Sequence, residues 1–490
     1  MQNDLTTGSV FRNVLSFSLP YLLSYFLQTL YGMADLFIIG QFEGVASTTA
    51  VSIGSQVMHM LTVMLVGLAM GATVSIAQAA GGGDKKRTAS AIGNTVTLFM
   101  LLSLALTALL LALRGGIVSI MSTPEEAVQG TLAYLTVCFI GIPFITAYNI
   151  IASIFRGLGD SKSPMYFIAV ACVVNIALDY YFMGTLHLGP AGAALGTTLS
   201  QAVSVLVSLA IILKRRLISV RRADFRPQRA VMGKLLQIGV PVALQDGFIQ
   251  VSFVIITIIA NRRGLTDAAA VGIVEKIIGF LFLIPSSMLS TVSALGAQNI
   301  GAGKPERARL TLRYAAMIAC SFGIAVVILT LFIAEPLGEI TLIHSPALRL
   351  FWIDTALTAP DYSALELSTS RLAAAQAEAL VFLGKVGFSV SQEHLNVGSF
   401  GQYDGEFLVL DEADRFAGDV IDLPASLCAR VRFRGHHAES PAQYRRLMQF
   451  IREEGYTAAG FSREITVIDY GFTPDTEKFV TEIMIPLQKV

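Results

Sequence analysis

The sequence predicts an all-α polytopic membrane bundle followed by a small soluble α+β domain. Of the 490 residues, 54% are hydrophobic and only 14% are charged, whereas soluble domains carry roughly 25% charged residues. Charges cluster in short loops up to about Glu339, but after about Asp354 they recur every few residues and the long apolar runs stop. We therefore expect the first part to lie in a membrane and the second part to be soluble.

Nine apolar segments are long enough to cross a bilayer, which takes about 20 residues of helix. They cover residues 14–41, 49–78, 91–113, 128–154, 164–186, 191–213, 236–260, 268–296 and 311–334. Pro20 interrupts the first segment, which is tolerated because neighbouring helices satisfy the freed carbonyl. The N-terminus has no cationic start or cleavage site, so this segment is expected to be retained rather than removed as a signal peptide.

A sequence repeat relates the ends of the second and eighth segments. Residues 77–87 read AQAAGGGDKKR, and residues 297–307, which lie 220 positions later, read AQNIGAGKPER. Pro20 and Pro241, 221 positions apart, hold matching places in the first and seventh segments. Internal repeats of this kind are typical of membrane proteins built from two related bundles.

The repeat sets the expected domain boundaries. The first lobe covers residues 1–213 with six transmembrane helices, a basic linker covers 214–234, and a partial second lobe covers 235–340 with three helices. The fourth span of the second copy is expected near 348–374, but that region is too polar to cross a membrane. We expect either that a second chain completes the second lobe or that this is a truncated and fused protein.

Lysine and arginine are concentrated in the loops that follow the even-numbered segments, above all in the linker. Cytoplasmic loops of membrane proteins carry such an excess of cations. The expected location is therefore the cell membrane, with multiple passes and a cytoplasmic N-terminus.

Two carboxylates and one amide stand in the spans of the first lobe. Asp35 and Asp179 each lie six residues before the expected outer end of their segment, about 9 Å along the helix axis. Asn175 lies one turn from Asp179. Carboxylates within spans are costly and mark ion pathways, and two at one depth can share a proton because like charges raise one pKa. The alternative is that water or a helix cap holds each one near a helix end.

The membrane part resembles the multidrug and toxic compound extrusion (MATE) transporters. The residues that carry the resemblance are Pro20, Ala34-Asp35, the run from Arg156 to Asp160, Asn175-x-x-x-Asp179, the run from Gly192 to Gly196, and the two repeated loops. The resemblance implies two six-helix lobes around a cleft, export of lipophilic or cationic small molecules against a proton or sodium gradient, and Asp35, Asn175 and Asp179 as ion-coupling residues. It implies no bound cofactor, because the coupling ion is itself transported.

The soluble part is expected to fold as an α+β domain over residues 361–490. Strands are expected at 407–410, 426–434, 457–470 and 477–487, and a helix at 365–386. Ser440 followed by Pro441 predicts the start of another helix, with Ser440 as its cap, and Gly455 ends it. The pair His436-His437 is expected to form a surface turn.

Residues 420–487 resemble the gyrase-inhibitor-like, drug-binding domain of multidrug-sensing transcription regulators. The resemblance rests on the runs from Ile421 to Pro424 and Ala429 to Val431, on Gln443 to Ile451, on Arg463 to Ile465, and on Phe472 to Ile483. The resemblance implies that Glu464 is a buried glutamate that neutralises lipophilic cations inside an aromatic cage, and that Phe479 belongs to the cage. The alternative is that Glu464 is exposed or pairs with Arg463 or Arg430. Since residues 361–419 match poorly, the first strand of the family is expected to be lost.

These observations predict a cation-coupled multidrug efflux antiporter of the MATE type with an appended drug-binding domain. Two alternatives are a membrane-tethered drug sensor without transport and a lipid-linked saccharide flippase of the same superfamily. No catalytic constellation or metal-ligand spacing is present, so an enzyme is not expected. The expected partners are small molecules and the lipid bilayer, and the net charge of zero gives no nucleic-acid footprint.

Overall fold

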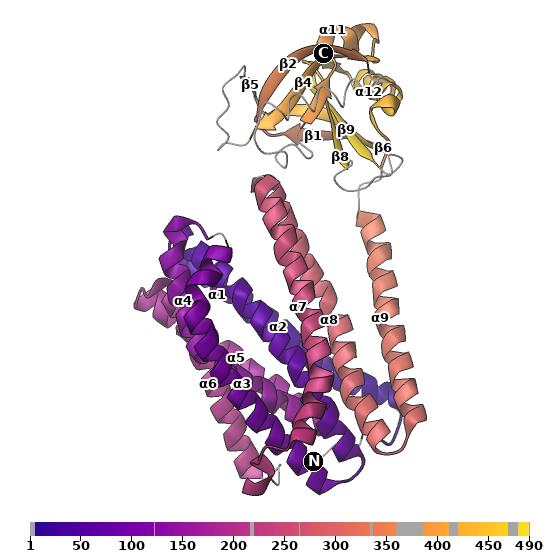
Figure 1. Ribbon diagram of the computed structural model, residues 1–490. Helices are drawn as coiled ribbons and strands as arrows, with labels where there is room; N and C mark the ends of the chain where they lie inside the picture. Colours follow the sequence, from indigo (N-terminus) through magenta and orange to yellow (C-terminus); the bar gives the residue numbers. More distant parts are fainter. Residues whose placement is uncertain are drawn as a thin grey trace. The chain divides into compact units, whose positions relative to one another are not determined.

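The structure is a computed structural model that describes residues 5–121, 123–215, 220–263, 265–333, 337–358, 386–410, 420–468 and 479–489. The chain divides into two compact units, one made of long helices and one that contains a β-sheet (Figure 1). The expected fold class, a membrane bundle of helices followed by a small α+β domain, is confirmed.

Within the described residues, each of the nine apolar segments forms a helix that is long and apolar enough to cross a membrane. The helices are α1 (Val10–Phe42), α2 (Val45–Gly81), α3 (Lys85–Ile120), α4 (Glu125–Gly157), α5 (Lys162–Asp179), α6 (Gly189–Arg215), α7 (Arg229–Arg263), α8 (Leu265–Gly301) and α9 (Pro305–Ile333). A π-helical segment, Tyr180–Thr185, continues α5. The helices are longer than the expected apolar segments, because polar residues at their ends also adopt the helical conformation.

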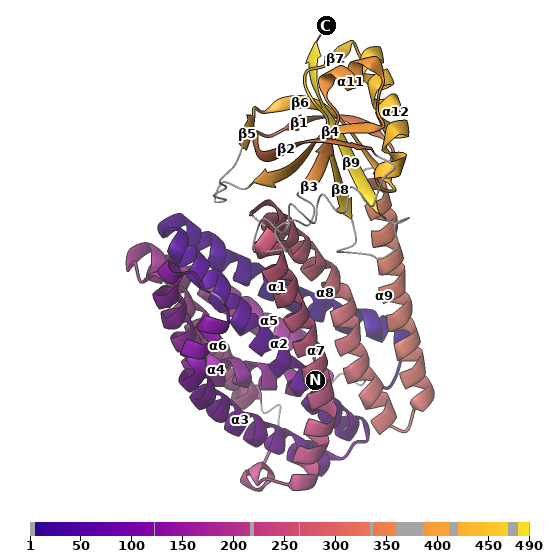
Figure 2. The same ribbon diagram turned by 45° about the horizontal axis from the view of Figure 1, so that its top comes forward.

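The first lobe, α1–α6, is organised around α4, which packs against α2, α3 and α6, while α1 packs against α5 (Figure 2). Helix α4 is apolar on several sides, and its residues Leu135, Phe139 and Ile142 are all buried. A helix that is apolar on most sides belongs in the middle of a bundle. This lobe supplies the frame for the polar residues described below.

The glycines of the repeated motif end their helices. Gly83 follows α2 with φ of 69° and Gly303 follows α8 with φ of 72°, the left-handed conformation that terminates helices and favours glycine. In the first copy Asp84 then starts α3, because its carboxylate accepts a hydrogen bond from the backbone N–H of Arg87 at 2.9 Å. Both turns need a residue with a positive φ, which explains why glycine recurs at positions 83 and 303.

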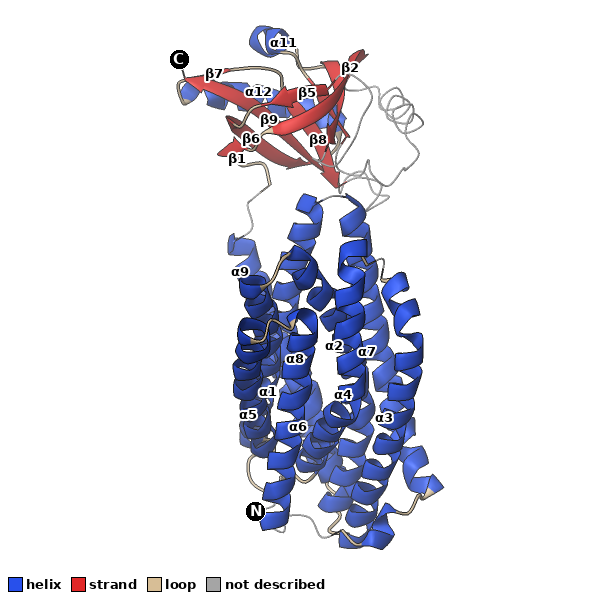
Figure 3. Ribbon diagram, turned by 90° about the vertical axis from the view of Figure 1, so that its left-hand side faces the viewer, coloured by secondary structure: helices blue, strands red, loops and turns tan. Residues whose placement is uncertain are grey.

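The second unit contains an antiparallel sheet with strand order β1-β6-β9-β8-β3-β4-β2-β5, and β7 pairs with β9 (Figure 3). The strands are β1 (Ile340–Ser345), β2 (Leu348–Thr358), β3 (Val386–Ser389), β4 (Gln402–Leu410), β5 (Val420–Leu423), β6 (Ser426–Arg434), β7 (Tyr456–Ala458), β8 (Arg463–Ile468) and β9 (Val480–Lys489). Helices α11 (Gln392–Val397) and α12 (Ser440–Glu453) complete it. The central pair, β3 with β8, places Phe388 opposite Glu464.

The structure corrects the expected start of this domain. Its sheet begins at Ile340, rather than near residue 361, because β1 pairs with β6 and β2 pairs with β4. Residues 348–358, the first part of the region where a fourth span was expected, form strand β2 of this sheet. Their polar composition agrees with this assignment. The expectation that the first strand is lost is wrong for the same reason.

One other expected strand differs from the structure, and one expected helix is not described by it. The strand expected at 457–470 is split into β7 and β8, since Ala459 donates its backbone N–H to Pro486 and Ser462 donates to Val390, which turns the chain between them. The helix expected at 365–386 lies outside the described residues except for Val386, which begins β3.

Helix α12 begins one residue earlier than expected. Glu439 occupies the cap position and Ser440 is the first helical residue, so Ser440 is not the cap. The helix buries one face against the sheet through Tyr444, Leu447 and Ile451. Its N-terminus thereby lies beside β8, which matters for the site around Glu464.

Candidate functional sites

The first candidate site lies between α1, α5 and α6. Asp35, Asn175 and Asp179 are all buried, with exposed fractions of 3%, 1% and 0%. Asp179 and Asn175 lie against Gly196 of α6, and Asp35 accepts a hydrogen bond from the adjacent Thr197. The sequence placed the two carboxylates at one depth and Asn175 one turn away, and the structure brings all three to the same part of α6.

The hydrogen-bonding capacity of this cluster is largely unused. Thr197 on α6 donates its hydroxyl to Asp35 Oδ2 at 3.1 Å. Within the described chain, Asp35 Oδ1, both carboxylate oxygens of Asp179 and both amide atoms of Asn175 have no hydrogen-bond partner of good geometry. Buried polar atoms are nearly always paired in proteins. Such a cluster is chemically suited to hold a proton or a small cation.

Two residues of α6 shape the cluster, and sequence reasoning did not assign them to it. A Cβ added to Gly196 would overlap Asp179 Oδ1 and would lie 3.6 Å from Asn175 Nδ2. The absence of a side chain at position 196 therefore leaves room for a carboxyl group from α5. Thr197, the next residue, gives the hydrogen bond to Asp35. In the sequence, the only sign of this role is that a hydroxyl residue, Thr197, directly follows the small residue Gly196.

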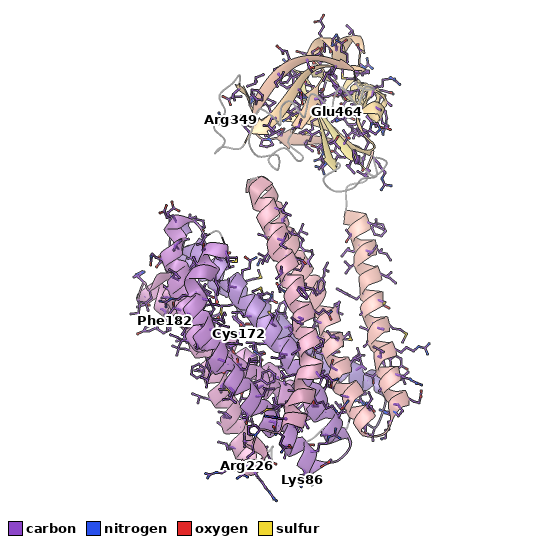
Figure 4. The ribbon with its side chains drawn as sticks, in the orientation of Figure 1. Lys86, Cys172, Phe182, Arg226, Arg349 and Glu464 are labelled. Atoms are coloured by element: carbon purple, nitrogen blue, oxygen red, sulfur yellow. The ribbon has the colours of Figure 1, made fainter. Side chains whose placement is uncertain are left out.

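The π-helical segment also begins at this cluster, directly after Asp179. π-Helical turns insert an extra residue per turn and occur often at functional sites. Figure 4 shows Cys172 on α5 and Phe182 in the π-helical segment of the first lobe. Because the helix changes from α to π after Asp179, the side chains beyond it point in other directions than they would on a continued α-helix.

The second candidate site is the seam where the two repeats meet. We call the end of the bundle at which α2 joins α3 and α8 joins α9 the basic end. There, a Cβ added to Gly81 would overlap the carbonyl oxygen of Gln298, and one added to Gly301 would overlap the carbonyl oxygen of Gln78. The two copies of the repeated motif therefore cross each other, each glycine against the glutamine of the other copy.

Both glutamine side chains also bond across the seam. Gln298 donates to the carbonyl of Gly157 on α4 at 3.1 Å, and Gln78 accepts a hydrogen bond from Lys234 on α7 at 2.8 Å. Further along, Gly71 on α2 and Gly239 on α7 approach the backbone of the opposite helix in the same close way. The lobes are thus joined backbone to backbone at the basic end.

The N-terminal segment fastens the same end. Arg307 donates to the carbonyls of Gly8 at 3.0 Å and Thr7 at 3.1 Å, and Lys304 donates to the carbonyl of Thr6 at 2.9 Å. The bonds from Arg307 and Lys304 tie the start of the first lobe to the second lobe. Within the first lobe, Arg156 at the end of α4 stacks over the ring of Tyr21 on α1, 4.0 Å from its centroid.

The third candidate site surrounds Glu464 on β8, which is fully buried (Figure 4). Tyr403 donates its hydroxyl to Glu464 Oε1 at 2.6 Å, His437 Nδ1 lies 2.6 Å from the same oxygen, and Ser440 also donates to it. Oε2 has no hydrogen-bond partner in the described chain. The N-terminus of α12, which begins at Ser440, adds a favourable dipole for a negative charge.

Aromatic rings line the same site. Phe388 stacks on Tyr403 with centroids 5.1 Å apart and meets the ring of His437 edge-on at 4.9 Å. Burial and the neighbouring Glu464 carboxylate raise the pKa of Tyr403 well above its usual value, so Tyr403 stays a neutral donor. The site thus combines a carboxylate oxygen that has no partner in the described chain with a cluster of aromatic rings, and the faces of such rings attract cations.

Glu464 is buried, as the resemblance implied, rather than exposed as in the alternative. Its partners in the described chain are Tyr403, His437 and Ser440, whereas Arg463 donates to Ser345 and Cys428. His437 does not belong to a surface turn, since it is buried and bonds to Glu464. Phe479 is buried just before β9, with its carbonyl accepting from Gly435, and its place in a cage stays a prediction.

Comparison with known families agrees with both units. The MatE family matches residues 20–181 and 241–347, more than half of the chain. The chain belongs to the MatE family. A second family, the GyrI-like small molecule binding domain, matches residues 339–488. The matched region includes β1 and β2, in agreement with the sheet that begins at Ile340.

Curated relatives are similar over the membrane part. A probable multidrug resistance protein of Bacillus subtilis, YpnP, is 31% identical over 306 residues, which are 62% of this chain and 68% of that protein. The probable multidrug resistance protein NorM of Thermotoga maritima is 26% identical and covers 67% and 72%. This MatE protein is therefore a multi-pass membrane protein of a transporter family, and it carries a GyrI-like domain.

Solved structures share the fold. A MOP superfamily transporter from Pyrococcus furiosus is 26% identical with a TM-score of 0.62, covering 67% of this chain and 74% of that one. An outward-facing multidrug resistance MATE family transporter is 25% identical with a TM-score of 0.61 and covers the same shares. The family match over residues 20–181 includes Asp35, Asn175 and Asp179.

Proposed function

We propose that this MatE protein is a cation-coupled efflux antiporter that exports lipophilic or cationic small molecules, and that its GyrI-like domain binds compounds of the same kind. The observation that carries the proposal is the cluster of Asp35, Asn175 and Asp179, buried within the bundle with most of its oxygens unpartnered. A buried cluster of this kind is stabilised when it takes up a proton or a sodium ion, since either supplies the missing partner.

The coupling follows from competition between two states. With the ion bound, the two carboxyls no longer repel and the helices α1, α5 and α6 can pack tightly around them. Without it, water or a cationic substrate must satisfy the charge. A gradient of the ion then favours one arrangement on each side of the membrane, which is how differential affinity drives a conformational change.

We propose that the basic end faces the cytoplasm, as does the N-terminus. Support comes from the exposed cations Lys85, Lys86 and Arg87 at the start of α3, and from those of the linker. In this orientation Gln78, Gln298 and their glycines lie at the cytoplasmic ends of α2 and α8. We also propose that a second chain completes the second lobe, because the described part of this chain supplies α7–α9 and then enters the sheet.

Efflux from vesicles tests the transport proposal. The full chain is reconstituted in liposomes, and export of a fluorescent cation is measured after a proton or a sodium gradient is imposed. The wild type is expected to respond to one gradient, and Asp35→Asn and Asp179→Asn are expected to lose the response. The control is Asp84→Asn, because asparagine caps α3 as well as aspartate does. Equal gradient-driven export by wild type and Asp35→Asn would refute the role of the cluster.

The second candidate function is a membrane-tethered ligand sensor without transport. It is favoured by one observation: all described partners of Glu464 come from the sheet-containing unit itself, whereas the second lobe has three described helices. Saturable dye binding together with no gradient-driven export by the intact protein would favour the sensor over the antiporter.

A further inference from the structure

The linker between the lobes contains a short, fixed element that transport does not explain. Residues 221–228, which we call the linker clip, include a turn of 3₁₀ helix from Arg222 to Phe225. The carboxylate of Asp224 accepts a hydrogen bond from the backbone N–H of Arg221 at 2.7 Å and closes the turn. The clip therefore has a defined shape.

The clip is held against the side of α3. The amide of Asn94 donates to the carbonyl of Asp224 at 3.2 Å and accepts from the backbone N–H of Gln228 at 2.7 Å. Thr97 donates to the carbonyl of Phe225 at 2.8 Å. Gly93 leaves room for this contact, because a Cβ there would overlap the carbonyl of Asp224. Hydrogen bonds to α3 therefore hold the clip in place, in addition to its covalent connection to the chain.

The docking point lies where α3 enters the apolar layer. No charged residue occurs between Arg87 and Arg114, a run of 26 residues. At 1.5 Å per residue this run spans about 39 Å, more than the roughly 30 Å of hydrocarbon. Residues 93–97 lie about 9–15 Å along the helix axis from Arg87, which is the level at which the basic end of α3 enters the hydrocarbon. Phe225, with 40% of its surface exposed, is held at that level.

The cations of the clip are free to bind an anion. Arg221, Arg222 and Arg226 are exposed. In the described part of the chain, no carboxylate forms an ion pair with any of the three. Figure 4 shows Arg226 at the same end of the helical unit as Lys86. An exposed aromatic ring at interface depth, flanked by unpaired guanidinium groups, is complementary to a lipid with a negative headgroup.

We propose that the linker clip is a binding site for an anionic phospholipid. Phe225 inserts at the level of the glycerol and upper acyl chain, and Arg222 and Arg226 bind the phosphodiester, which matches the planar donor fork of guanidinium. Because Asn94 and Thr97 already hold the clip in place, little ordering is required on binding. The bound lipid would anchor the connection between the two lobes to one leaflet.

Fluorescence quenching tests the site. The chain has one tryptophan, so W352F provides a background in which F225W is the only indole. The full chain is reconstituted in phosphatidylcholine vesicles that contain equal mole fractions of a lipid brominated near the headgroup, either phosphatidylglycerol or phosphatidylcholine. Brominated phosphatidylglycerol is expected to quench up to about 30-fold more effectively per mole fraction, because two cations near the surface contribute about 1 kcal/mol each.

Two variants in the same background decide the outcome. R222Q/R226Q is expected to abolish the preference for phosphatidylglycerol while F225W remains quenched by both lipids. R309Q removes an exposed arginine of α9 that pairs with Glu306, and it is expected to keep the preference. Circular dichroism and gel filtration confirm that each variant is folded. Equal quenching by the two lipids, or an unchanged preference in R222Q/R226Q, overturns the proposal.

Discussion

Gly81 of α2 lies directly against the carbonyl of Gln298 on α8, and Gly301 lies in the same way against Gln78. The repeated motif is therefore a reciprocal contact between its own two copies. Each copy supplies a glycine that lets the backbones meet and a glutamine whose side chain bonds to the opposite lobe. The most visible repeat in the sequence marks the place where the lobes are fastened together.

This contact predicts that Gly81→Ala destabilises the helical unit. The added methyl group overlaps the carbonyl of Gln298, and overpacking of this kind costs about 1–3 kcal/mol. The expected result is a lower Tm of the purified full chain in a thermal-shift assay. Gly115→Ala in α3 is the control, because nothing lies within 4 Å of its position. If both variants melt like the wild type, the seam is not close-packed in solution.

The cluster of the first lobe predicts an effect at a residue that carries no charge. Gly196→Ala pushes a methyl group into Asp179 Oδ1 and so displaces the carboxyl from Asp35. We expect gradient-driven efflux to fall by about tenfold or more, since such a displacement costs at least about 1.4 kcal/mol.

Gly192→Ala is the matched control for Gly196→Ala on the same helix. Its methyl group would lie 3.2–3.3 Å from Leu188 Cβ, Phe182 Cβ and Met183 Cγ, a tight contact rather than an overlap, and none of these atoms belongs to a carboxyl group. Efflux by Gly192→Ala should stay close to wild type. An equal loss in both variants would point to helix packing rather than to the carboxyl cluster.

The site around Glu464 predicts charge-dependent binding of organic cations. Glu464→Gln keeps the shape of the side chain but removes its charge, and we expect a lipophilic cationic dye to bind about 10–100-fold more weakly. Fluorescence titration of the full chain measures the Kd. Glu453→Gln, at the exposed end of α12, should bind like the wild type. An unchanged Kd for Glu464→Gln would exclude this carboxylate from binding.

The sheet-containing unit has a pH-dependent contact at Asp404. Burial disfavours its charge, but hydrogen bonds from Ser391 and His394 outweigh burial and hold the pKa of Asp404 below its usual value. A carboxylate with a lowered folded-state pKa adds stability above its unfolded-state pKa of about 3.9, and this stability is lost as the pH falls through the folded-state pKa.

Asp404→Asn is therefore expected to lower the Tm at pH 7 and to flatten the fall in Tm at acidic pH. Thermal melts of the full chain between neutral and acidic pH measure both effects. Asp422→Asn is the comparison, because Asp422 is 81% exposed and its ion pair with Arg349 is long, at 3.5 Å. A melting curve for Asp404→Asn that falls with acid as steeply as the wild type would contradict the assignment.

Much of this architecture follows from local patterns. The nine spans, the repeat and the interruption of the second copy rest on apolar runs, turn glycines and charge, all of which a linear sequence displays. The same patterns placed Asp35 and Asp179 at comparable depth and Asn175 one turn from Asp179, since helical rise converts residue number into height. They failed at the start of the soluble domain, because β1 and β2 are recognisable as strands only by their pairing with β6 and β4.

What the sequence by itself determined is the membrane bundle, its duplicated plan and the buried residue types in each site. Only the tertiary structure decided which distant residues meet: Gly196 and Thr197 beside the carboxylates, His437, Tyr403 and Ser440 around Glu464, and the two glutamines across the seam. The physical reason is that periodicity reports which face of an element is apolar, whereas the partner of a polar group is set by packing between elements far apart in the chain.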